Sequence, residues 1–352
     1  MLKLTNEFRY YFVPETKRFN WDEIIIDLFY IKWHSRVGMP ATLTLGRQNI
    51  ILGEGFIVMD GHPLDGSRSI YFNAARLDLE LSQRNKLTMF YSYQPETDDI
   101  LPVIHDRKQK LIEQPEKGVG VCYSGNLTQV NLQGYFIRKD VSGIATRPTK
   151  SVINSVGGRL QLPTAAHLTV TAEGAYQFGK YGDVSRSAVG GYARIDYQTN
   201  WQLYLPRLLS LETVCLSGDN PVTVKYEGWE PMFARWPKWS ESYIYTQIKE
   251  DAVAWWTNLI SLHGGARFQL APSLDLSLDY HHLLAFREPV DSLPFPGGNG
   301  KTRGDLFIGK LTFQINDYLS GHLLWEGFLP GNYYFSTADP YSWVRFELLL
   351  KL

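Results

Sequence analysis

Residues 274–281 have the sequence LDLSLDYH, and this stretch decides the fold class. Leucine and tyrosine occupy the even positions, whereas aspartate, serine and histidine occupy the odd positions. Successive side chains of a β-strand point to opposite faces, so a strand here has one apolar face and one polar face. The C-terminal residues 342–352 repeat the pattern, with Val344, Phe346 and Leu348 alternating with Arg345 and Glu347. Alternation with a period of two indicates strands and not helices.

Segments of the same kind follow one another along the whole chain. Sixteen can be delimited, at 2–12, 23–33, 41–50, 69–82, 85–94, 117–124, 127–138, 151–162, 166–178, 187–198, 207–216, 254–269, 273–281, 304–314, 318–328 and 342–352. Short connections with turn residues, such as 83–85, 124–126, 271–273 and 316–317, alternate with long polar ones at 51–67, 95–116, 139–150, 217–252, 287–302 and 330–341. Short turns at one end and long loops at the other are typical of outer-membrane barrels.

The composition excludes several other classes of protein. The 352 residues contain 35 Lys+Arg and 36 Asp+Glu, and this balance gives no basic surface for nucleic acid. Two cysteines exclude a disulfide scaffold and a cysteine-rich metal site. No uncharged apolar run reaches the roughly 18–20 residues of a membrane-spanning helix. Aromatic residues near strand ends fit girdles at the lipid–water interface, and these are Tyr91, Tyr93, Tyr176, Tyr197, Tyr280, Trp325 and Phe346.

We therefore expect one all-β domain over residues 1–352, a transmembrane antiparallel β-barrel in the outer membrane of a Gram-negative cell. In a barrel of about sixteen strands the apolar faces contact lipid, and the polar faces line a lumen too wide for side chains to fill. The alternative is a soluble β-rich binding protein, in which the apolar faces of two sheets stack on each other.

The inward positions of such a barrel carry as many basic as acidic residues. The basic ones are Lys3, Arg9, Arg76, Lys86, Arg159, Arg194, Arg267, Lys310, Arg345 and Lys351. The acidic ones are Glu7, Asp78, Glu80, Glu173, Asp196, Glu212, Asp275, Asp279, Glu326 and Glu347. Two interpretations stay open: ladders of opposite charge that brace the wall, or a charged constriction that selects an ionic solute.

Catalytic patterns are weak in this sequence. The histidines on strands, such as His263 and His281, lack a same-face partner and a carboxylate at metal-ligand spacing. Ser217-Gly218-Asp219 has no G-x-S-x-G context, and no glycine-rich phosphate loop joins a strand to a helix. We expect no catalytic residues, no metal and no cofactor. An enzyme built on an outer-membrane barrel remains the alternative to a channel.

The longest connection, residues 217–252, is rich in aromatic residues. A large apolar surface on an exposed loop usually finds a partner surface, and long connections are usually functional. We expect this loop to fold against or into the barrel mouth, with Trp229, Arg235, Trp236, Lys238 and Trp239 as constriction candidates. Aromatic faces beside cations suit sugars with acidic substituents. The alternative is a loop that only packs on its neighbours above the membrane.

Three stretches resemble the alginate export family of outer-membrane porins. The first contains Gly46-Arg47-Gln48, then Gly53-Glu54-Gly55, then Asp65-Gly66-Ser67-Arg68 leading into 72–77; the second is 211–220, with Ser217-Gly218-Asp219; the third is 339–347. The resemblance implies an eighteen-stranded barrel that exports an anionic polysaccharide through a basic lumen. Its expected partners are outer-membrane lipid, the saccharide and periplasmic export proteins.

The sequence departs from the family in strand number and in lumen charge. Sixteen segments, and no signal-peptide pattern in residues 1–12, favour a chain that lacks an N-terminal hairpin and its signal peptide. If the chain is complete, residues 2–12 must pair with 342–352, since an open edge is costly in lipid. The balanced charge favours another polar or anionic oligosaccharide over alginate itself.

The pore-lining candidates are Arg9, Arg47, Arg76, Arg159, Arg194, Arg267, Lys310 and Arg345. Arg47 and Arg76 lie within stretches that match the family. Strict alternation places Arg47 on the apolar face of Leu45, so it reaches the lumen only if the strand is irregular at Gly46.

Overall fold

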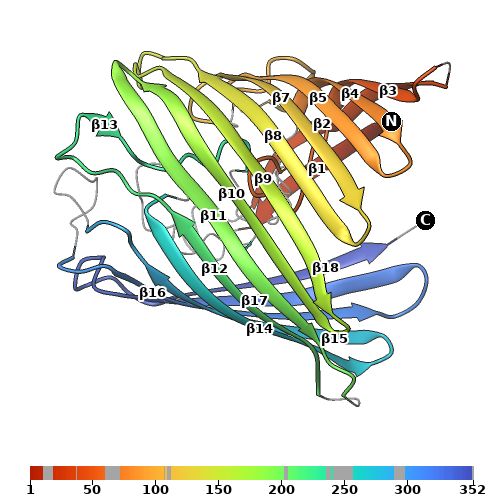
Figure 1. The fold of residues 1–352 in the computed structure, drawn as a ribbon, viewed down its shortest axis with the longest axis vertical. Helices are drawn as coiled ribbons and strands as arrows, with labels where there is room; N and C mark the ends of the chain where they lie inside the picture. The colour runs from red at the N-terminus through yellow and green to blue at the C-terminus, as the bar shows by residue number, and fades with distance from the viewer. Residues whose placement is uncertain are drawn as a thin grey trace.

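The computed structural model describes residues 1–10, 19–36, 38–59, 72–106, 108, 112–201, 205–234, 239–240, 257–288 and 298–350. For residues 5–10 and 19–22 it describes the backbone only. Every regular element in this part of the chain is a β-strand (Figure 1). Within the same residues, no helix has the length and apolar character needed to cross a membrane.

Sixteen long strands make up the wall. They are β1 (Leu2–Tyr10), β2 (Phe19–Ser35), β3 (Ala41–Gln48), β4 (Phe72–Ser82), β5 (Asn85–Gln94), β7 (Glu116–Leu127), β8 (Val130–Val141), β9 (Ser151–Ala165), β10 (Leu168–Tyr181), β11 (Val184–Gln198), β12 (Pro206–Leu216), β14 (Leu259–Ala271), β15 (Leu274–Leu284), β16 (Thr302–Gln314), β17 (Leu319–Pro330) and β18 (Tyr341–Leu350). Two-residue strands, β6 (Val103–Ile104) and β13 (Lys225–Tyr226), lie in the connections. The sixteen segments expected from alternation correspond one to one to the long strands, so that prediction is confirmed.

Each long strand pairs antiparallel with the next one along the chain, and all belong to one sheet. Short connections such as 83–84, 128–129 and 272–273 lie at the end of the sheet where both chain termini are found, and most long ones lie at the other end (Figure 1). The tight turn 182–183 is an exception at the long-loop end, where Gly182 adopts a φ of +59°. The expected meander is therefore confirmed.

The two outermost strands have one long partner each. β1 pairs with β2, and β18 pairs with β17. No register joins β1 to β18 among the described residues, which exclude 11–18 and 351–352. The alternatives for how the barrel closes both stay predictions.

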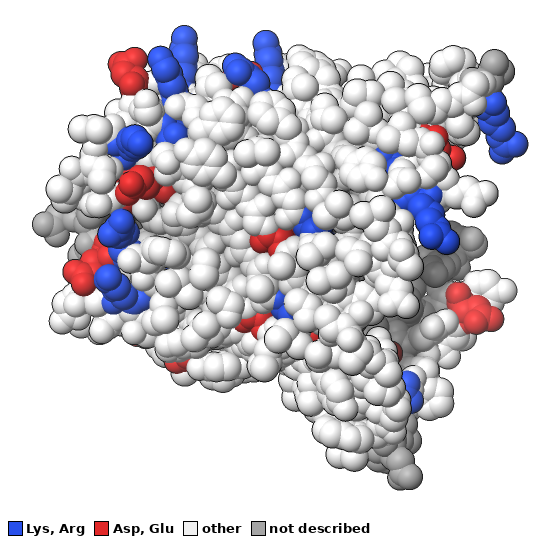
Figure 2. Space-filling view, in the orientation of Figure 1, with Lys and Arg blue, Asp and Glu red and all other residues white. Residues whose placement is uncertain are grey.

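The two faces of the wall differ as expected for a membrane barrel. In β15, Leu278 and Tyr280 are 45% and 41% exposed, whereas His281 and Leu283, which follow them on the alternate face, are buried. The exposed face elsewhere also carries large apolar side chains, such as Val189, Ile195 and Leu211. Figure 2 shows one side of the molecule with uncharged side chains over most of the wall and charged ones mainly at its rims. The apolar face of the strands therefore points to lipid.

The interior differs from the expected polar lumen. A cluster of buried apolar side chains joins the inner wall to residues of the long connections, among them Phe56, Trp229 and Tyr334. Wall residues such as Ile137 and Leu306 take part in it on the inward face. The physical reason is that long connections fold inward and fill space that strand side chains alone cannot fill.

Candidate pore constriction

The first inward segment is residues 49–59, which we call the plug loop. Its backbone turns back on itself, with hydrogen bonds from Leu52 N to Val58 O and from Gly55 N to Leu52 O. Gly53 and Gly55 have φ angles of +58° and +82°, a region that favours glycine. Phe56, Ile57 and Val58 are buried in the apolar cluster. The Gly-Glu-Gly sequence therefore forms a tight tip that presents Glu54.

Glu54 reaches the basic side chains of the opposite wall. Its carboxylate accepts a bond of 2.6 Å from Arg159 Nη2 and bonds of 2.8 and 3.0 Å from Arg194 Nη1 and Nη2. The Tyr192 hydroxyl donates to the same carboxylate at 3.2 Å. Arg159 comes from β9, and Tyr192 and Arg194 come from β11. Charge-assisted hydrogen bonds and bidentate pairs of this kind are stronger than hydrogen bonds between neutral groups.

Further carboxylates surround this contact. Glu173 accepts hydrogen bonds from the hydroxyls of Tyr135 and Tyr192, at 3.2 and 3.1 Å. Asp196 accepts from Arg194 Nε at 2.8 Å, and a Glu212 oxygen lies 3.6 Å from Arg194 Nη1. Two guanidinium groups thus contact three carboxylates, and a fourth, that of Glu173, joins them through Tyr192. With the plug loop in place, this part of the lumen carries no surplus positive charge.

The second inward segment comprises residues 226–234 with 239–240, which we call the inner segment. Glu230 pairs with Lys139 Nζ at 2.9 Å, and that ammonium also meets Glu116 at 3.1 Å and donates to Met232 O at 2.7 Å. Gln177 of β10 exchanges two hydrogen bonds with the backbone of Glu230. Lys139 is 1% exposed, and a buried ammonium needs such partners. The inner segment is therefore anchored to the barrel wall.

The far side of the inner segment has its own anchors. Trp239 Nε1 donates to Glu212 of β12, and Ser240 Oγ donates to Glu326 of β17 at 2.6 Å. Trp229 is 1% exposed and stacks on Phe56 of the plug loop at 5.4 Å between ring centroids. Trp229 and Trp239 thus lie inside the wall. Arg235, Trp236 and Lys238 lie outside the described residues.

The two inward segments contact each other directly. Phe233 N donates to Ile57 O at 3.0 Å, Met59 N donates to Phe233 O at 3.4 Å, and Val58 and Phe233 form a parallel bridge. Phe56 also meets the ring of Trp239 edge-on, at 6.4 Å. Together they form one packed unit inside the wall at the long-loop end, with polar anchors at its edge.

A family model described as alginate export matches residues 10–285. This chain belongs to the alginate export family. The match spans the plug loop, the inner segment and the strands that hold them, apart from β17, and the resemblance carried by the Gly-Arg-Gln and Gly-Glu-Gly stretches is confirmed. A search of curated proteins gave no match. Together with the strand-only wall, membership makes the protein an outer-membrane β-barrel porin and an export channel for polysaccharide.

Arg47 shows how the family's Gly-Arg-Gln stretch is built. It is 2% exposed, its guanidinium pairs with Asp98 at 2.5 and 3.0 Å, and it also donates to Ile26 O at 2.7 Å and to Asn73 at 3.1 Å. Leu45 is 49% exposed, so the two residues lie on opposite faces. The φ of +121° at Gly46 breaks the alternation, while the register with both neighbouring strands continues unshifted. The guanidinium group of Arg47 is therefore occupied by the carboxylate of Asp98, which belongs to a long connection.

The remaining candidates lie on several parts of the wall. Arg76 pairs with Asp78, Arg267 with Asp279, and Arg345 donates to His322. Lys310 lies on the face of β16 that also carries Leu306 and Ile308 of the apolar cluster. The side chain of Arg9 and the motif residues Asp65–Arg68 lie outside the described part of the chain. Among the candidates whose side chains the structure describes, only Arg159 and Arg194 have contacts with the plug loop, and the roles of all these residues in the pore stay predictions.

Sequence reasoning missed the groups that complete the site. Glu54 stood in a motif already singled out, but only the basic residues of the motifs were considered for the pore. The separation of Glu54 from Arg194 is 140 residues, so no local spacing could connect them. Lys139 and Glu230 were also missed, because both belong to connections or strand ends with no clear alternation. Among the described residues, no group of three or more His, Cys, Asp or Glu could hold a metal ion.

Proposed function

We propose that the exported polysaccharide is made of acidic sugars, and that its carboxylates replace Glu54 on Arg159 and Arg194. The observation that carries this proposal is the contact itself: a carboxylate already fits between the two guanidinium groups and the Tyr192 hydroxyl. A uronate carboxylate has the same shape and charge. Glu54 belongs to a connection and not to a wall strand. A sugar carboxylate can therefore replace it on Arg159 and Arg194 without breaking hydrogen bonds between the strands.

We further propose that residues 1–352 act as one barrel domain and as a channel without chemistry of its own. The strands from β1 to β18 share one sheet, which supports the single domain. The plug loop and the inner segment then serve as the constriction. Displacement of the plug loop frees Arg159 from its carboxylate and widens the path.

The test is single-channel recording in planar bilayers with Glu54→Gln. The amide keeps the size of the side chain but loses its charge, so both ion pairs weaken. We expect higher conductance, a shift toward anion preference, and block by an oligouronate at a several-fold lower concentration. A neutral oligosaccharide of the same length should show no such gain.

Glu113→Gln is the matched control, because Glu113 pairs with Arg147 in an exposed position at the long-loop end. It should behave like the parent protein. If Glu54→Gln barrels insert normally and have unchanged conductance, selectivity and block, the proposed role of Glu54 is wrong.

A further inference from the structure

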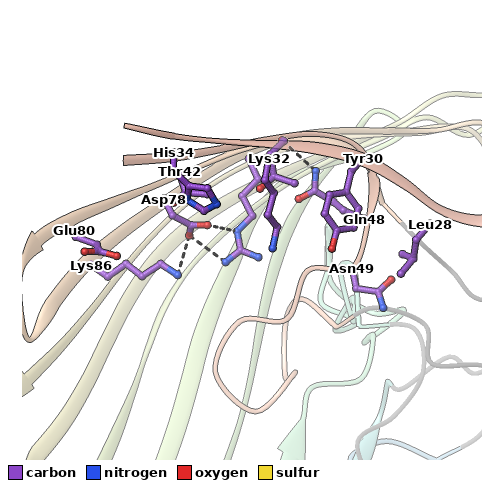
Figure 3. A pocket seen from close by; sticks show the side chains of 12 residues that line it. Leu28, Tyr30, Lys32, His34, Thr42, Gln48, Asn49, Asp78, Glu80 and Lys86 are labelled. Atoms are coloured by element: carbon purple, nitrogen blue, oxygen red, sulfur yellow. Dashed lines mark hydrogen bonds and ion pairs between the residues drawn. The ribbon is translucent and has the colours of Figure 1, made fainter. Parts of the chain in front are cut away.

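A pocket of about 450 Å³ lies in the inner wall formed by β2–β5, apart from the Glu54 contact. This volume is in the range of small-molecule sites, roughly 300–1,000 Å³. Figure 3 shows side chains of the wall around one space, with Glu80 and Lys86 toward one end and Leu28 and Asn49 toward the other. His34 and Lys86 lie beside the short turns, and Asn49 is the first residue of the plug loop. Since short turns face the periplasm, an exported molecule meets this pocket before the plug loop.

One carboxylate orders the basic wall of the pocket. Asp78 accepts from Lys86 Nζ at 2.9 Å, from Arg76 Nη2 at 3.0 Å and from Thr88 Oγ1 at 2.7 Å. An ammonium has three N–H donors, and the Lys86 side chain is 44% exposed. Lys86 therefore keeps donors for a ligand while Asp78 holds it in place.

Lys32 adds a second cation to the same space. Its Nζ lies 5.3 Å from the centroid of the Tyr30 ring, and it forms no ion pair within the residues that the structure describes. The pocket lining holds three cations, Lys32, Arg76 and Lys86, against two carboxylates, Asp78 and Glu80. This leaves an excess of one positive charge, in contrast to the surplus of carboxylates around Glu54.

The remaining lining suits a sugar ring. Tyr30 offers an aromatic face beside Lys32, and such faces stack on the apolar side of a pyranose. Thr42 and His34 hydrogen-bond to each other at 2.9 Å and provide polar groups at the turn end. We propose that this pocket binds one acidic sugar unit from the periplasmic side, its carboxylate on Lys32 and Lys86 and its ring against Tyr30. The inference rests on the proposed function and adds a docking subsite before the constriction.

The test measures block of single-channel current by glucuronate, with glucose as the neutral probe, each added to the side of the short turns. We expect glucuronate to block the parent protein and glucose not to. Lys32→Gln and Lys86→Gln should each raise the half-blocking concentration about tenfold, since each loses a charged hydrogen bond. Tyr30→Leu should weaken block while leaving the ion preference unchanged.

Lys117→Gln is the matched control, because Lys117 lies 6.0 Å from the ring of Tyr93 in the same kind of pair, and both side chains are on the exposed face. It should keep the parent block. Heat-modifiable gel mobility checks that every variant folds.

The outcomes separate this inference from the proposed function. If an oligouronate blocks the parent channel but Lys32→Gln and Lys86→Gln leave glucuronate block unchanged, the pocket is not the subsite, and the function stands. If glucose blocks the channel as strongly as glucuronate does, the assignment of an acidic sugar to the pocket is wrong. If neither glucuronate nor an oligouronate affects the parent channel, both proposals fail.

Discussion

At residue 46 the strand β3 leaves strict alternation without gaining a residue. A Cβ at this position would lie 2.3 Å from the carbonyl oxygen of Phe29 on the neighbouring strand, and the φ of +121° is one that other residues rarely adopt. Glycine therefore permits Leu45 to face lipid while Arg47, two residues further on, is buried on the opposite face. The Arg47–Asp98 pair anchors Asp98, in the connection between β5 and β7, to the wall, and it depends on this one backbone angle.

Gly46→Ala should destabilise the folded barrel by about 1–3 kcal/mol, the usual range for a residue forced into a disfavoured backbone region. Urea unfolding in detergent micelles measures the change. Gly134→Ala is the control, because a Cβ there meets nothing within 4 Å and its φ is ordinary. Equal stability of the two variants would show that the fold does not require glycine at residue 46.

At the scale of a single strand, β12 presents opposite chemistry on adjacent residues. Leu211 is 67% exposed on the outer face near the middle of the strand. Its neighbour Ser210 donates to Asp196 at 2.6 Å on the inner face. The same alternation, repeated in each strand, separates the lipid from the lumen.

Leu211→Arg should therefore impair insertion much more than Ser210→Arg. Arginine on the lipid face near the bilayer centre costs about 2–4 kcal/mol, whereas at position 210 it meets the carboxylate of Asp196. The fraction folded into lipid vesicles, read from heat-modifiable mobility, compares the two. Comparable losses would contradict the assignment of the faces.

Across the whole molecule, the plug loop and the inner segment act as one body. A backbone hydrogen bond from Phe233 to Ile57 and the stacked rings of Phe56 and Trp229 connect them, and both belong to one apolar cluster. Each is also anchored separately, by Arg159 and Arg194 in one case and by Lys139 and Gln177 in the other. Removal of one segment should therefore loosen the other.

Deletion of 222–248 should raise single-channel conductance and reduce ion preference, because it removes the inner segment and exposes the side of the plug loop that packs on it. Recording in planar bilayers measures both quantities. Deletion of 144–147, an exposed stretch at the same end of the barrel, is the control and should change neither. If the deletion variant folds and inserts normally but keeps the conductance of the parent protein, this loop does not constrict the pore.

Sequence alone determined the wall of this protein. Each strand has lipid on one side and the barrel interior on the other, so its side chains alternate in polarity with a period of two. This local pattern can be recognised in stretches such as 274–281. The number of long strands, the direction of their faces and the arrangement of turns all follow from it. The family came from a separate source, the resemblance of the stretches 46–77, 211–220 and 339–347 to the alginate export porins. The basic residues Arg159 and Arg194 could be placed on the inward face for the same reason.

Tertiary structure alone decided what fills the lumen. Loops have no periodic pattern, so nothing local shows whether 49–59 folds inward or which wall residues it meets. Glu54 and Arg194 are 140 residues apart, and Lys139 and Glu230 are 91 apart; only the folding of the loops against the inner face of the sheet brings them together. The excess of carboxylates around the plug loop and the excess of cations in the β2–β5 pocket are likewise properties of this packing, because a charge count along the chain averages the two regions to near zero.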